Sequence, residues 1–325
     1  MGSPPAATRL DLPAGDYRSV AWLDDGSMYY SEGIYDARGE VVGEVVGSYR
    51  DGQTRALEMP SVDGCLTGFA SSLTRMPDGR LGYVVPCEPP AGAASASESL
   101  RALDTDTLEG EELARVGVHV SEYAFSAAGE PGDLGVVSVS SRICATAAWL
   151  RFGSVEPIAI EVQVGDARMR LDDERLDSMD DCSNFGRATS PTWSPDGRDL
   201  ALLVSPASAG RSGASRLDAP WGVVIIDPTE GTAETLIGGI DSAYDMEWSH
   251  DGEQLAFSAD GYGGRSGTFV YEFKTGEVRH VAAETLFSLA WSPDSSQIAG
   301  RWDPDEQLRD RVLVVVDVAD SDAGS

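Results

Sequence analysis

The sequence predicts an all-β fold assembled from copies of one four-stranded sheet. The first observation is a repeated phrase, which reads Trp-Ser-Pro-Asp-Gly at 193–197, Trp-Ser-His-Asp-Gly at 248–252 and Trp-Ser-Pro-Asp-Ser at 291–295. Looser copies stand at 22–26 and 75–79. The second observation is that each copy lies between two short apolar runs, which is the pattern of a β-hairpin. Repetition of this kind is typical of a fold built from similar units.

Each repeat can be followed strand by strand. An inner strand leads into the phrase, where Pro presets φ, Asp bonds its own backbone and Gly takes the positive φ of the corner. A second and a third strand follow, and a Gly-containing turn leads to an outer strand. The clearest case is the strand 270–273, the turn Lys274-Thr275-Gly276-Glu277 and the strand 278–282. Four antiparallel strands per repeat predict the blade of a β-propeller.

The spacing of the turns predicts the number of blades. The turn aspartates are Asp25, Asp78, Asp196, Asp251 and Asp294. The interval between Asp78 and Asp196 is about twice the others, so one more blade with a degraded turn is expected there. Its inner strand fits 119–126 and its second strand fits 134–140. The sequence therefore predicts a six-bladed β-propeller.

The two ends of the chain complement each other in this scheme. The last repeat supplies an inner strand at 286–291, a second at 297–302 and a third at 312–318, but no outer strand. Residues 7–13 precede the first inner strand, where the other repeats place an outer strand. We therefore expect this N-terminal strand to complete the last blade and close the ring, because closure removes an open sheet edge.

The expected domain organisation is simple. We expect a single propeller domain over 7–318, an expression remnant without fixed structure at 1–6, and a disordered tail at 319–325. No apolar stretch has the length that crosses a bilayer. A link to a membrane is expected only through a lipid anchor that has been removed together with any signal peptide.

The repeats resemble the TolB-type propeller repeat, whose consensus has Ser-Pro-Asp-Gly, then an Ile/Leu-Ala-Phe strand and a later Thr-Gly-Glu turn. The resemblance is strong over 189–238, 241–283 and 284–318, fair over 17–60 and 64–115, and weak over 119–175. TolB carries an additional N-terminal α/β domain, for which this sequence leaves no room. The resemblance implies the propeller fold and an extracytoplasmic setting. It implies no catalytic mechanism, because the shared residues belong to turns and to the core.

The charge balance narrows the range of partners. The chain has a formal net charge of −30, from 54 acidic and 24 basic residues. Such a surface repels nucleic-acid phosphates and disfavours an anionic membrane surface. Solubility is the simplest reason for the charge, and Ca²⁺ or a cationic partner is the alternative.

The four cysteines indicate the compartment. Cys65 and Cys87 both fall at the top end of the second blade, and Cys144 and Cys182 both fall at the top between the third and fourth. Disulfides Cys65–Cys87 and Cys144–Cys182 are therefore expected, which implies an oxidising compartment. A zinc site is the rival, although the sequence has no Cys-x-x-Cys pair.

Alignment of the inner strands on their Trp position yields two rings of residues near the channel. The polar ring comprises Ser19, Ser72, Glu122, Ser190, Asp245 and Ser288, and the ring one residue earlier comprises Arg18, Ser71, Ser121, Thr189, Tyr244 and Phe287. The carboxylates of Glu122 and Asp245 are candidates for acid–base catalysis or for a cation site, and His119 approaches the channel mouth. The competing interpretation is that they bind channel water and neighbouring backbone. No Gly-x-Ser-x-Gly elbow is present.

Long loops between second and third strands are the candidate recognition surface. We expect such loops at 205–221, 260–267 and 304–311. Arginines and aromatic side chains on one face suit a carboxylate, a peptide or a glycan. The candidate ligand-binding residues are Arg18, Tyr244, Phe287, Arg211, Arg216, Trp221, Tyr262 and Arg265.

Two hypotheses of function follow. The first is a secreted or lipid-anchored binding module that recognises an envelope or extracellular protein, a peptide or a glycan at its top face, without a cofactor. The second is an envelope lyase or hydrolase that acts on a polysaccharide or peptide through Glu122, Asp245 and His119. Convergent carboxylates in a substrate-sized pocket would favour the enzyme.

Overall fold

The structure is a computed structural model. It describes residues 6–13, 15–66, 68–88, 97–116, 120–123, 136–140, 145–149, 159–164, 167–172, 187–205, 220–227, 230, 232–304 and 311–318, with the backbone alone between 120 and 188. Two compact units result, one formed by Met1–His119 with His280–Ser325 and the other by Val120–Arg279. Each unit is described by itself below.

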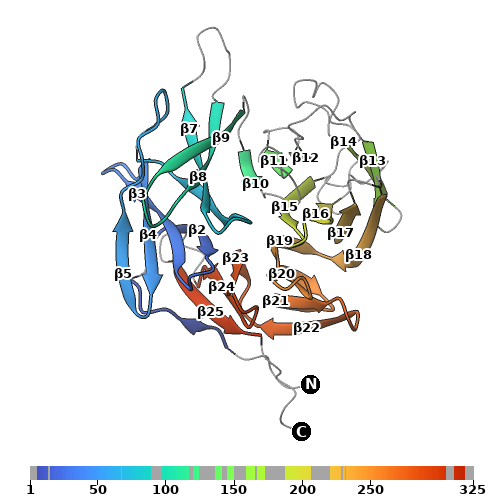
Figure 1. The fold of residues 1–325 in the computed structure, drawn as a ribbon. Helices are drawn as coiled ribbons and strands as arrows, with labels where there is room; N and C mark the ends of the chain where they lie inside the picture. Colours follow the sequence, from blue (N-terminus) through green and yellow to red (C-terminus); the bar gives the residue numbers. More distant parts are fainter. Residues whose placement is uncertain are drawn as a thin grey trace. The chain divides into compact units, whose positions relative to one another are not determined.

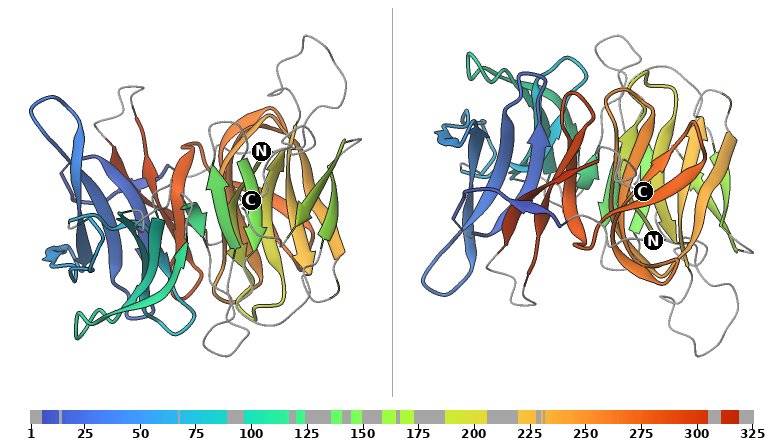
Figure 2. Two further views of the ribbon diagram at one scale, coloured as in Figure 1. Left: turned by 90° about the horizontal axis from the view of Figure 1, so that it is seen from above. Right: turned by 90° about the horizontal axis from the view of Figure 1, so that it is seen from below.

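All regular elements in the described part of the chain are β-strands (Figures 1 and 2). Within those residues there is no helix of the length and apolar character needed to cross a membrane. The all-β prediction is confirmed.

The first unit contains three four-stranded antiparallel sheets, with the strand orders β2-β3-β4-β5, β6-β7-β8-β9 and β1-β25-β24-β23. Their strands are β1 (Thr8–Arg9), β2 (Tyr17–Trp22), β3 (Met28–Tyr35), β4 (Val41–Arg50), β5 (Gln53–Leu57), β6 (Ser71–Arg75), β7 (Leu81–Cys87), β8 (Ser97–Leu103), β9 (Gly110–Val116), β23 (Leu286–Trp291), β24 (Gln297–Trp302) and β25 (Val312–Asp317).

The second unit contains two further four-stranded sheets, β15-β16-β17-β18 and β19-β20-β21-β22, together with a three-stranded and a two-stranded sheet. Their strands are β10 (Val120–Tyr123), β11 (Val136–Ser140), β12 (Ala145–Trp149), β13 (Ala159–Val164), β14 (Ala167–Asp172), β15 (Arg187–Trp193), β16 (Leu200–Ser205), β17 (Trp221–Asp227), β18 (Thr232–Ile240), β19 (Ser242–Trp248), β20 (Gln254–Tyr262), β21 (Arg265–Glu272) and β22 (Glu277–Ala282).

The fold is a β-propeller, but its four-stranded blades number five among the described residues, so the predicted six-bladed propeller is wrong. The expected blade at 119–175 is instead the three-stranded sheet β10-β11-β12 and the separate hairpin β13-β14. Val164 pairs with Ala167 across a two-residue connection, whereas residues 150–158 separate β12 from β13. A short connection costs less closure entropy than a long one, so β13 pairs with β14.

The N-terminal strand completes the last blade, as predicted. Thr8 pairs with Val315 and Arg9 with Val314 in antiparallel register, so the blue strand β1 lies beside the red strand β25 in Figure 1. The backbone N–H of Leu10 extends the pairing to the carbonyl of Leu313 at 2.9 Å. This pairing covers one edge of β25.

Within the two units, three pairs of neighbouring blades bury a hydrophobic cluster among the described residues. Val20 and Met28 of the first blade pack with Ala299 and Leu313 of the last, and Leu12 from the segment after β1 joins them. A second cluster joins the first blade to β6–β9, and a third lies in the second unit between β15–β18 and β19–β22. The alternating side chains of the strands thus form the core between sheets.

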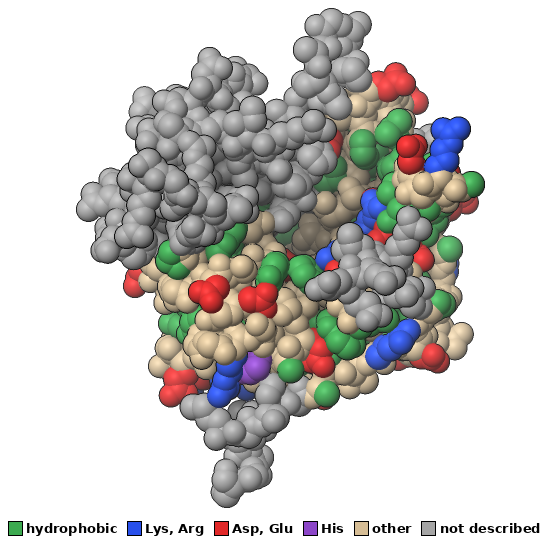
Figure 3. Space-filling view, turned by 180° about the vertical axis from the view of Figure 1, so that it is seen from behind, with side chains coloured by type: hydrophobic (Ala, Val, Ile, Leu, Met, Phe, Trp, Pro, Cys, Tyr) green, Lys and Arg blue, Asp and Glu red, His purple; other side chains and the backbone are tan. Residues whose placement is uncertain are grey.

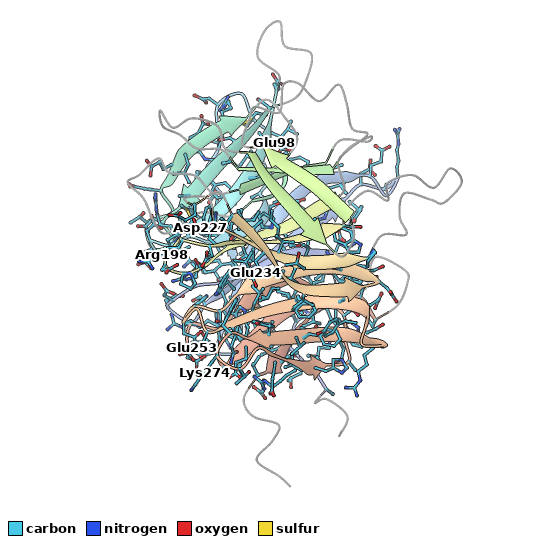
Figure 4. The ribbon with its side chains drawn as sticks, turned by 90° about the vertical axis from the view of Figure 1, so that its right-hand side faces the viewer. Glu98, Arg198, Asp227, Glu234, Glu253 and Lys274 are labelled. Atoms are coloured by element: carbon cyan, nitrogen blue, oxygen red, sulfur yellow. A yellow bond between two sulfur atoms is a disulfide. The ribbon has the colours of Figure 1, made fainter. Side chains whose placement is uncertain are left out.

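The repeated phrase forms the corner between inner and second strands, as predicted. In four copies the glycine takes a φ between 70 and 84°, and in the last copy Ser295 takes the same left-handed conformation. Ser194 Oγ donates to Asp196 Oδ1 at 2.7 Å, and the Ser–Asp pairs of the next two copies repeat the bond. Figure 4 shows Arg198, Glu253 and Lys274 together along the side of the second unit that carries these turns.

Candidate functional site

Charged side chains gather where the first and last blades of the first unit meet. Asp16 directly precedes β2, and Arg311 directly precedes β25. The backbone N–H of Gly15 donates to the carbonyl of Arg311 at 3.1 Å, which holds the two segments together. We name the resulting group the arginine–carboxylate cluster. Its members are Asp16, Arg18, Tyr35, Glu44, Arg301, Asp303 and Arg311.

The buried carboxylate of Asp16 is the centre of this cluster. Its Oδ2 accepts hydrogen bonds from Arg18 Nε at 2.8 Å and from the Tyr35 hydroxyl, and its Oδ1 accepts one from Arg311 Nη1. Burial by itself would raise the pKa of Asp16. The hydrogen bonds from Tyr35 and Arg18 and the charge of Arg311 outweigh burial and hold the pKa below its usual range. Asp16 is therefore ionised and held in one position.

Arg18 joins Asp16 to the β3–β4 hairpin. Its Nη1 donates to Glu44 Oε1 at 2.7 Å, and its guanidinium lies 6.0 Å from the centre of the Tyr35 ring. Burial raises the pKa of Glu44, and the nearby charge of Arg18 offsets only part of this effect. The second oxygen of Glu44, Oε2, is buried without a hydrogen-bond partner.

Arg301 connects two residues that the sequence placed at the channel mouth. Its guanidinium lies 4.7 Å above the ring of Phe287, and its Nη1 donates to the carbonyl of Arg18 at 3.5 Å. Its Nε is 3.1 Å from Asp303 Oδ1. The structure therefore brings Arg18 and Phe287 to one site. Arg301 and Asp303 were absent from the predicted ligand-binding set, because their proximity depends on the pairing of blades.

Glu32, on β3, lies beside the cluster, close enough for the charge of Asp16 to act on it. Burial and the neighbouring charge of Asp16 both raise the pKa of this half-buried carboxyl. A carboxyl with a raised pKa and partial access to solvent is a candidate proton donor.

Besides the charged and polar side chains of the cluster, the β3–β4 hairpin carries exposed hydrophobic side chains. Five large hydrophobic side chains are exposed among the described residues, at 37 to 52% of their surface, and all five belong to this corner. We name them the apolar patch: Ile34, Val41, Val42, Val45 and Leu66. The backbone N–H of Glu44 donates to the carbonyl of Gly68 at 2.6 Å and so joins the hairpin to the loop of Leu66.

The arginine–carboxylate cluster holds the β3–β4 hairpin in place. Tyr35 and Glu44 bind Asp16 and Arg18, while Val42 and Val45 stand exposed on the same short segment. Because the Tyr35 hydrogen bond anchors β3 and the Glu44 ion pair anchors β4, the apolar side chains are presented on a positioned support. Over the face drawn in Figure 3, acidic side chains are dispersed and do not form one patch.

The serines of the polar ring bond neighbouring blades to one another. Ser288 Oγ accepts the backbone N–H of Val20 at 2.8 Å, and Ser19 Oγ accepts that of Leu73 at 3.1 Å. Each inner strand shifts its register near this position, as in a β-bulge. Three serines at this position have a left-handed φ of 51 to 54°, namely Ser72, Ser190 and Ser288. The hydroxyls of Ser19 and Ser288 therefore connect neighbouring sheets by hydrogen bonds.

In the second unit, Tyr244 and Asp245 lie on β19 and are half-buried. The Tyr244 hydroxyl donates to Asp260 Oδ2 at 2.5 Å. Burial raises the pKa of Tyr244 most, the bond to Asp260 raises it further, and together they bring it to about 12. Ser190 Oγ donates to the carbonyl of Tyr244 at 3.4 Å. Asp245 Oδ1 accepts the backbone N–H of Met246 at 2.8 Å. These polar groups are thus engaged within the unit.

The remaining predicted aromatic residues contribute to packing. Trp221 and Tyr262 are partly buried against the same hydrophobic cluster, and the Tyr262 ring contacts Phe257 and Phe269 edge to face. The prediction of a long loop at 260–267 is wrong, because Tyr262 pairs with Arg265 across a tight Gly-Gly turn. Both glycines of this turn have a positive φ. That turn extends β20 and β21 as a hairpin.

Several predicted residues lie outside the described part of the chain. These are His119, Arg211, Arg216, Cys144 and Cys182, and for Glu122 and Ser121 the backbone alone is described. The expected loops at 205–221 and 304–311 lie mostly outside it as well.

The disulfide Cys65–Cys87 is formed, as predicted, and joins the loop of Leu66 to the end of β7. Among the described residues no three His, Cys, Asp or Glu side chains stand together as a group that could hold a metal ion. A disulfide is characteristic of proteins that fold in oxidising compartments.

Comparison with known proteins supports the fold. No family model matches the sequence, and no curated protein matches it either. Among solved structures, the chain is similar to an oligogalacturonate lyase from Vibrio parahaemolyticus with a TM-score of 0.51 and 10% identity, covering 97% of this chain and 92% of the lyase. TolB from Acinetobacter baumannii matches with a TM-score of 0.51 and 15% identity, covering 84% of this chain and 59% of TolB.

A puromycin-hydrolyzing peptidase from Mycobacterium tuberculosis matches with a TM-score of 0.53 and 12% identity, covering 98% of this chain and 55% of the peptidase. The chain thus spans little more than half the length of TolB and of the peptidase. At these identities the similarity establishes the propeller fold, which is shared by proteins of different activity.

Proposed function

We propose that this chain is an extracytoplasmic TolB-like propeller that binds a protein partner through the top of its first blade. The observation that carries the proposal is the apolar patch. Every exposed large hydrophobic side chain of the described residues belongs to it, and exposed apolar side chains concentrated in one place characterise protein-interaction surfaces. On a surface without an interaction site, exposed hydrophobic side chains would instead be scattered singly.

The chemistry of the partner follows from the charge of the chain. A net charge of −30 attracts a basic protein and repels an acidic one. The partner would bury the valines of the apolar patch. Arg18, at the border of the patch, keeps 28% of its side chain exposed. We therefore propose an envelope or extracellular protein that presents an apolar centre with a basic rim. Nucleic acid is not a proposed partner, and the proposal requires no cofactor.

The disulfide and the likeness to TolB support an extracytoplasmic location, with secretion or a lipid anchor as the two routes. The route leaves the binding surface unaffected, because the patch belongs to the folded first blade and to the loop that follows it.

Site-specific photo-crosslinking tests the surface in living source cells. A photoreactive residue at Val42 should trap one partner, whereas the same residue at Thr54, which is exposed on β5 of the same blade, should trap none. The trapped protein is then purified and titrated against variants. Val42→Asp with Val45→Asp should weaken binding at least about tenfold, and Thr54→Asp should leave it unchanged. Equal trapping at both positions, or equal affinity of all variants, would refute the proposal.

The second candidate is an envelope lyase or hydrolase, which the raised pKa of Glu32 beside Asp16 favours. The catalytic set that the sequence predicts, Glu122, Asp245 and His119, is a separate candidate for the same class of activity. A Ca²⁺ ion at the carboxylates is the cofactor that it would use. Turnover of an envelope polysaccharide or peptide that is abolished by Glu32→Gln or Asp245→Asn, and retained in the Val42→Asp variant, would establish it against the binding module.

A further inference from the structure

A groove opens at the other end of the first blade, between this blade and the last one. Its volume is about 360 Å³, within the range of roughly 300–1,000 Å³ that ligand sites occupy. Thr8 and Leu10 from the N-terminal segment and Val315 from β25 form one wall. No residue of the groove belongs to the arginine–carboxylate cluster or to the apolar patch, so the groove is a separate site.

The floor of the groove is a row of three side chains across three strands. Trp22 pairs with Met28, and Met28 pairs with Tyr49, so the three side chains share one face of the sheet. Met28 belongs to the buried hydrophobic cluster between the first and last blades, and Trp22 and Tyr49 are partly buried against this cluster. The indole N–H of Trp22 donates to the carbonyl of Gly26 at 3.2 Å, which fixes the ring. Two aromatic rings with a thioether between them thus form an apolar platform.

The rim of the groove carries excess negative charge. The carboxylates of Asp51 and Asp317 line it, with Arg50 as the cation among its lining residues. Arg50 is already engaged, since its Nη1 lies 3.2 Å from Asp25 Oδ2 and its Nε lies 3.9 Å from Asp51 Oδ2. Gln297 Nε2 donates to one oxygen of Asp317 at 2.7 Å. The charged rim therefore favours a cation over an anion.

We propose that this groove binds a basic peptide segment, with an ammonium or guanidinium group over the Trp22–Tyr49 platform and its positive charge facing Asp51 and Asp317. Aromatic faces attract cations, and the aliphatic stem of a lysine or arginine suits an apolar floor. β1 is the edge strand of its sheet, so its backbone offers hydrogen-bonding groups to an extended peptide beside the groove. The net charge of −30 draws such a segment toward the protein.

Calorimetric titration of the full chain with acetyl-trilysine amide tests the site at low salt, where surface charge is least screened. Tyr49→Leu should weaken binding about twofold to fivefold, because it removes a cation–π contact, while Tyr49→Phe should restore it. Asp317→Asn should weaken binding by a similar factor of about two to five. Circular dichroism and the melting temperature of each variant verify that it is folded.

The matched control is Glu253→Gln, which removes the same charge from an exposed turn of the second unit, labelled in Figure 4. Its affinity should equal that of the wild type. An equal loss in Glu253→Gln would assign the binding to overall charge and overturn the site. So would the absence of trilysine binding, or indifference to Tyr49→Leu and Asp317→Asn. Spermidine, which carries the same charge without a peptide backbone, should bind more weakly; equal or tighter binding of spermidine would overturn the peptide assignment. None of these outcomes involves the apolar patch.

Discussion

The carboxylate of Asp16 accepts a hydrogen bond from Arg311, which lies 295 positions later in the chain. The bond joins the segment before the first blade to the segment before the last strand. It reinforces the pairing of β1 with β25 in the same unit. Because Arg18 and Tyr35 bind the same carboxylate, this connection between blades also positions the hairpin that carries the apolar patch.

The first prediction concerns the acid sensitivity of this connection. The pKa of Asp16 is lower in the folded chain than its ordinary value of 3.8, so its ionised form stabilises the fold above that value. This contribution is lost as the pH falls through the lower, folded pKa. Asp16→Asn should lower the free energy of unfolding by about 3 kcal/mol at neutral pH. In urea titrations the difference from the wild type should shrink as the pH falls below 3.8. A difference that does not change with pH would contradict this role.

The second prediction concerns the serines between blades. Ser288→Ala removes the acceptor of the Val20 N–H, and a buried donor without a partner costs about 1–3 kcal/mol. Chemical denaturation should detect this loss. Ser48→Ala is the control, because Ser48 makes only an exposed bond of 3.5 Å, and it should change stability by less than about 0.5 kcal/mol. Equal stability of the two variants would show that the serine bond contributes nothing.

The third prediction concerns the N-terminal strand. A chain that lacks residues 6–12 would expose the edge of β25 and would lose the buried side chain of Leu12. We expect a lower melting temperature and concentration-dependent association, because an open edge pairs with other chains. Differential scanning calorimetry and sedimentation velocity measure the two effects. A truncated chain that remains monomeric with an unchanged melting temperature would contradict the closure.

The fourth prediction concerns the cysteines. Alkylation of the folded protein without reductant should add no mass, because we expect Cys144 and Cys182 to be paired as Cys65 and Cys87 are. Any adduct on intact protein would refute the second disulfide. Cys65→Ala with Cys87→Ala should cost about 3 kcal/mol of stability, the value for a loop of this length.

Much of the fold could be predicted from local sequence. The Trp-Ser-Pro-Asp-Gly phrase determines its own corner, because Ser, Asp and Gly bond and bend within a few residues of one another. The strand pattern and the missing outer strand of the last repeat likewise predicted the pairing of residues 8–9 with β25. The same reasoning failed between 119 and 175, where the phrase is missing and the length of the interval alone suggested a blade.

The sites depended on the tertiary structure. Arg18 and Phe287 could be selected from their place on inner strands, but Arg301, Asp303 and Arg311 reach them only because the last blade packs on the first. The groove likewise combines Thr8 with Tyr49 and Asp317, which no sequence spacing relates. Turns and strands arise from bonds between near neighbours, which leave a pattern in the sequence. Contacts between blades join residues from 54 positions apart, as for Ser19 and Leu73, to 295 positions apart, as for Asp16 and Arg311, so packing decided where the charged groups and aromatic rings of different blades meet.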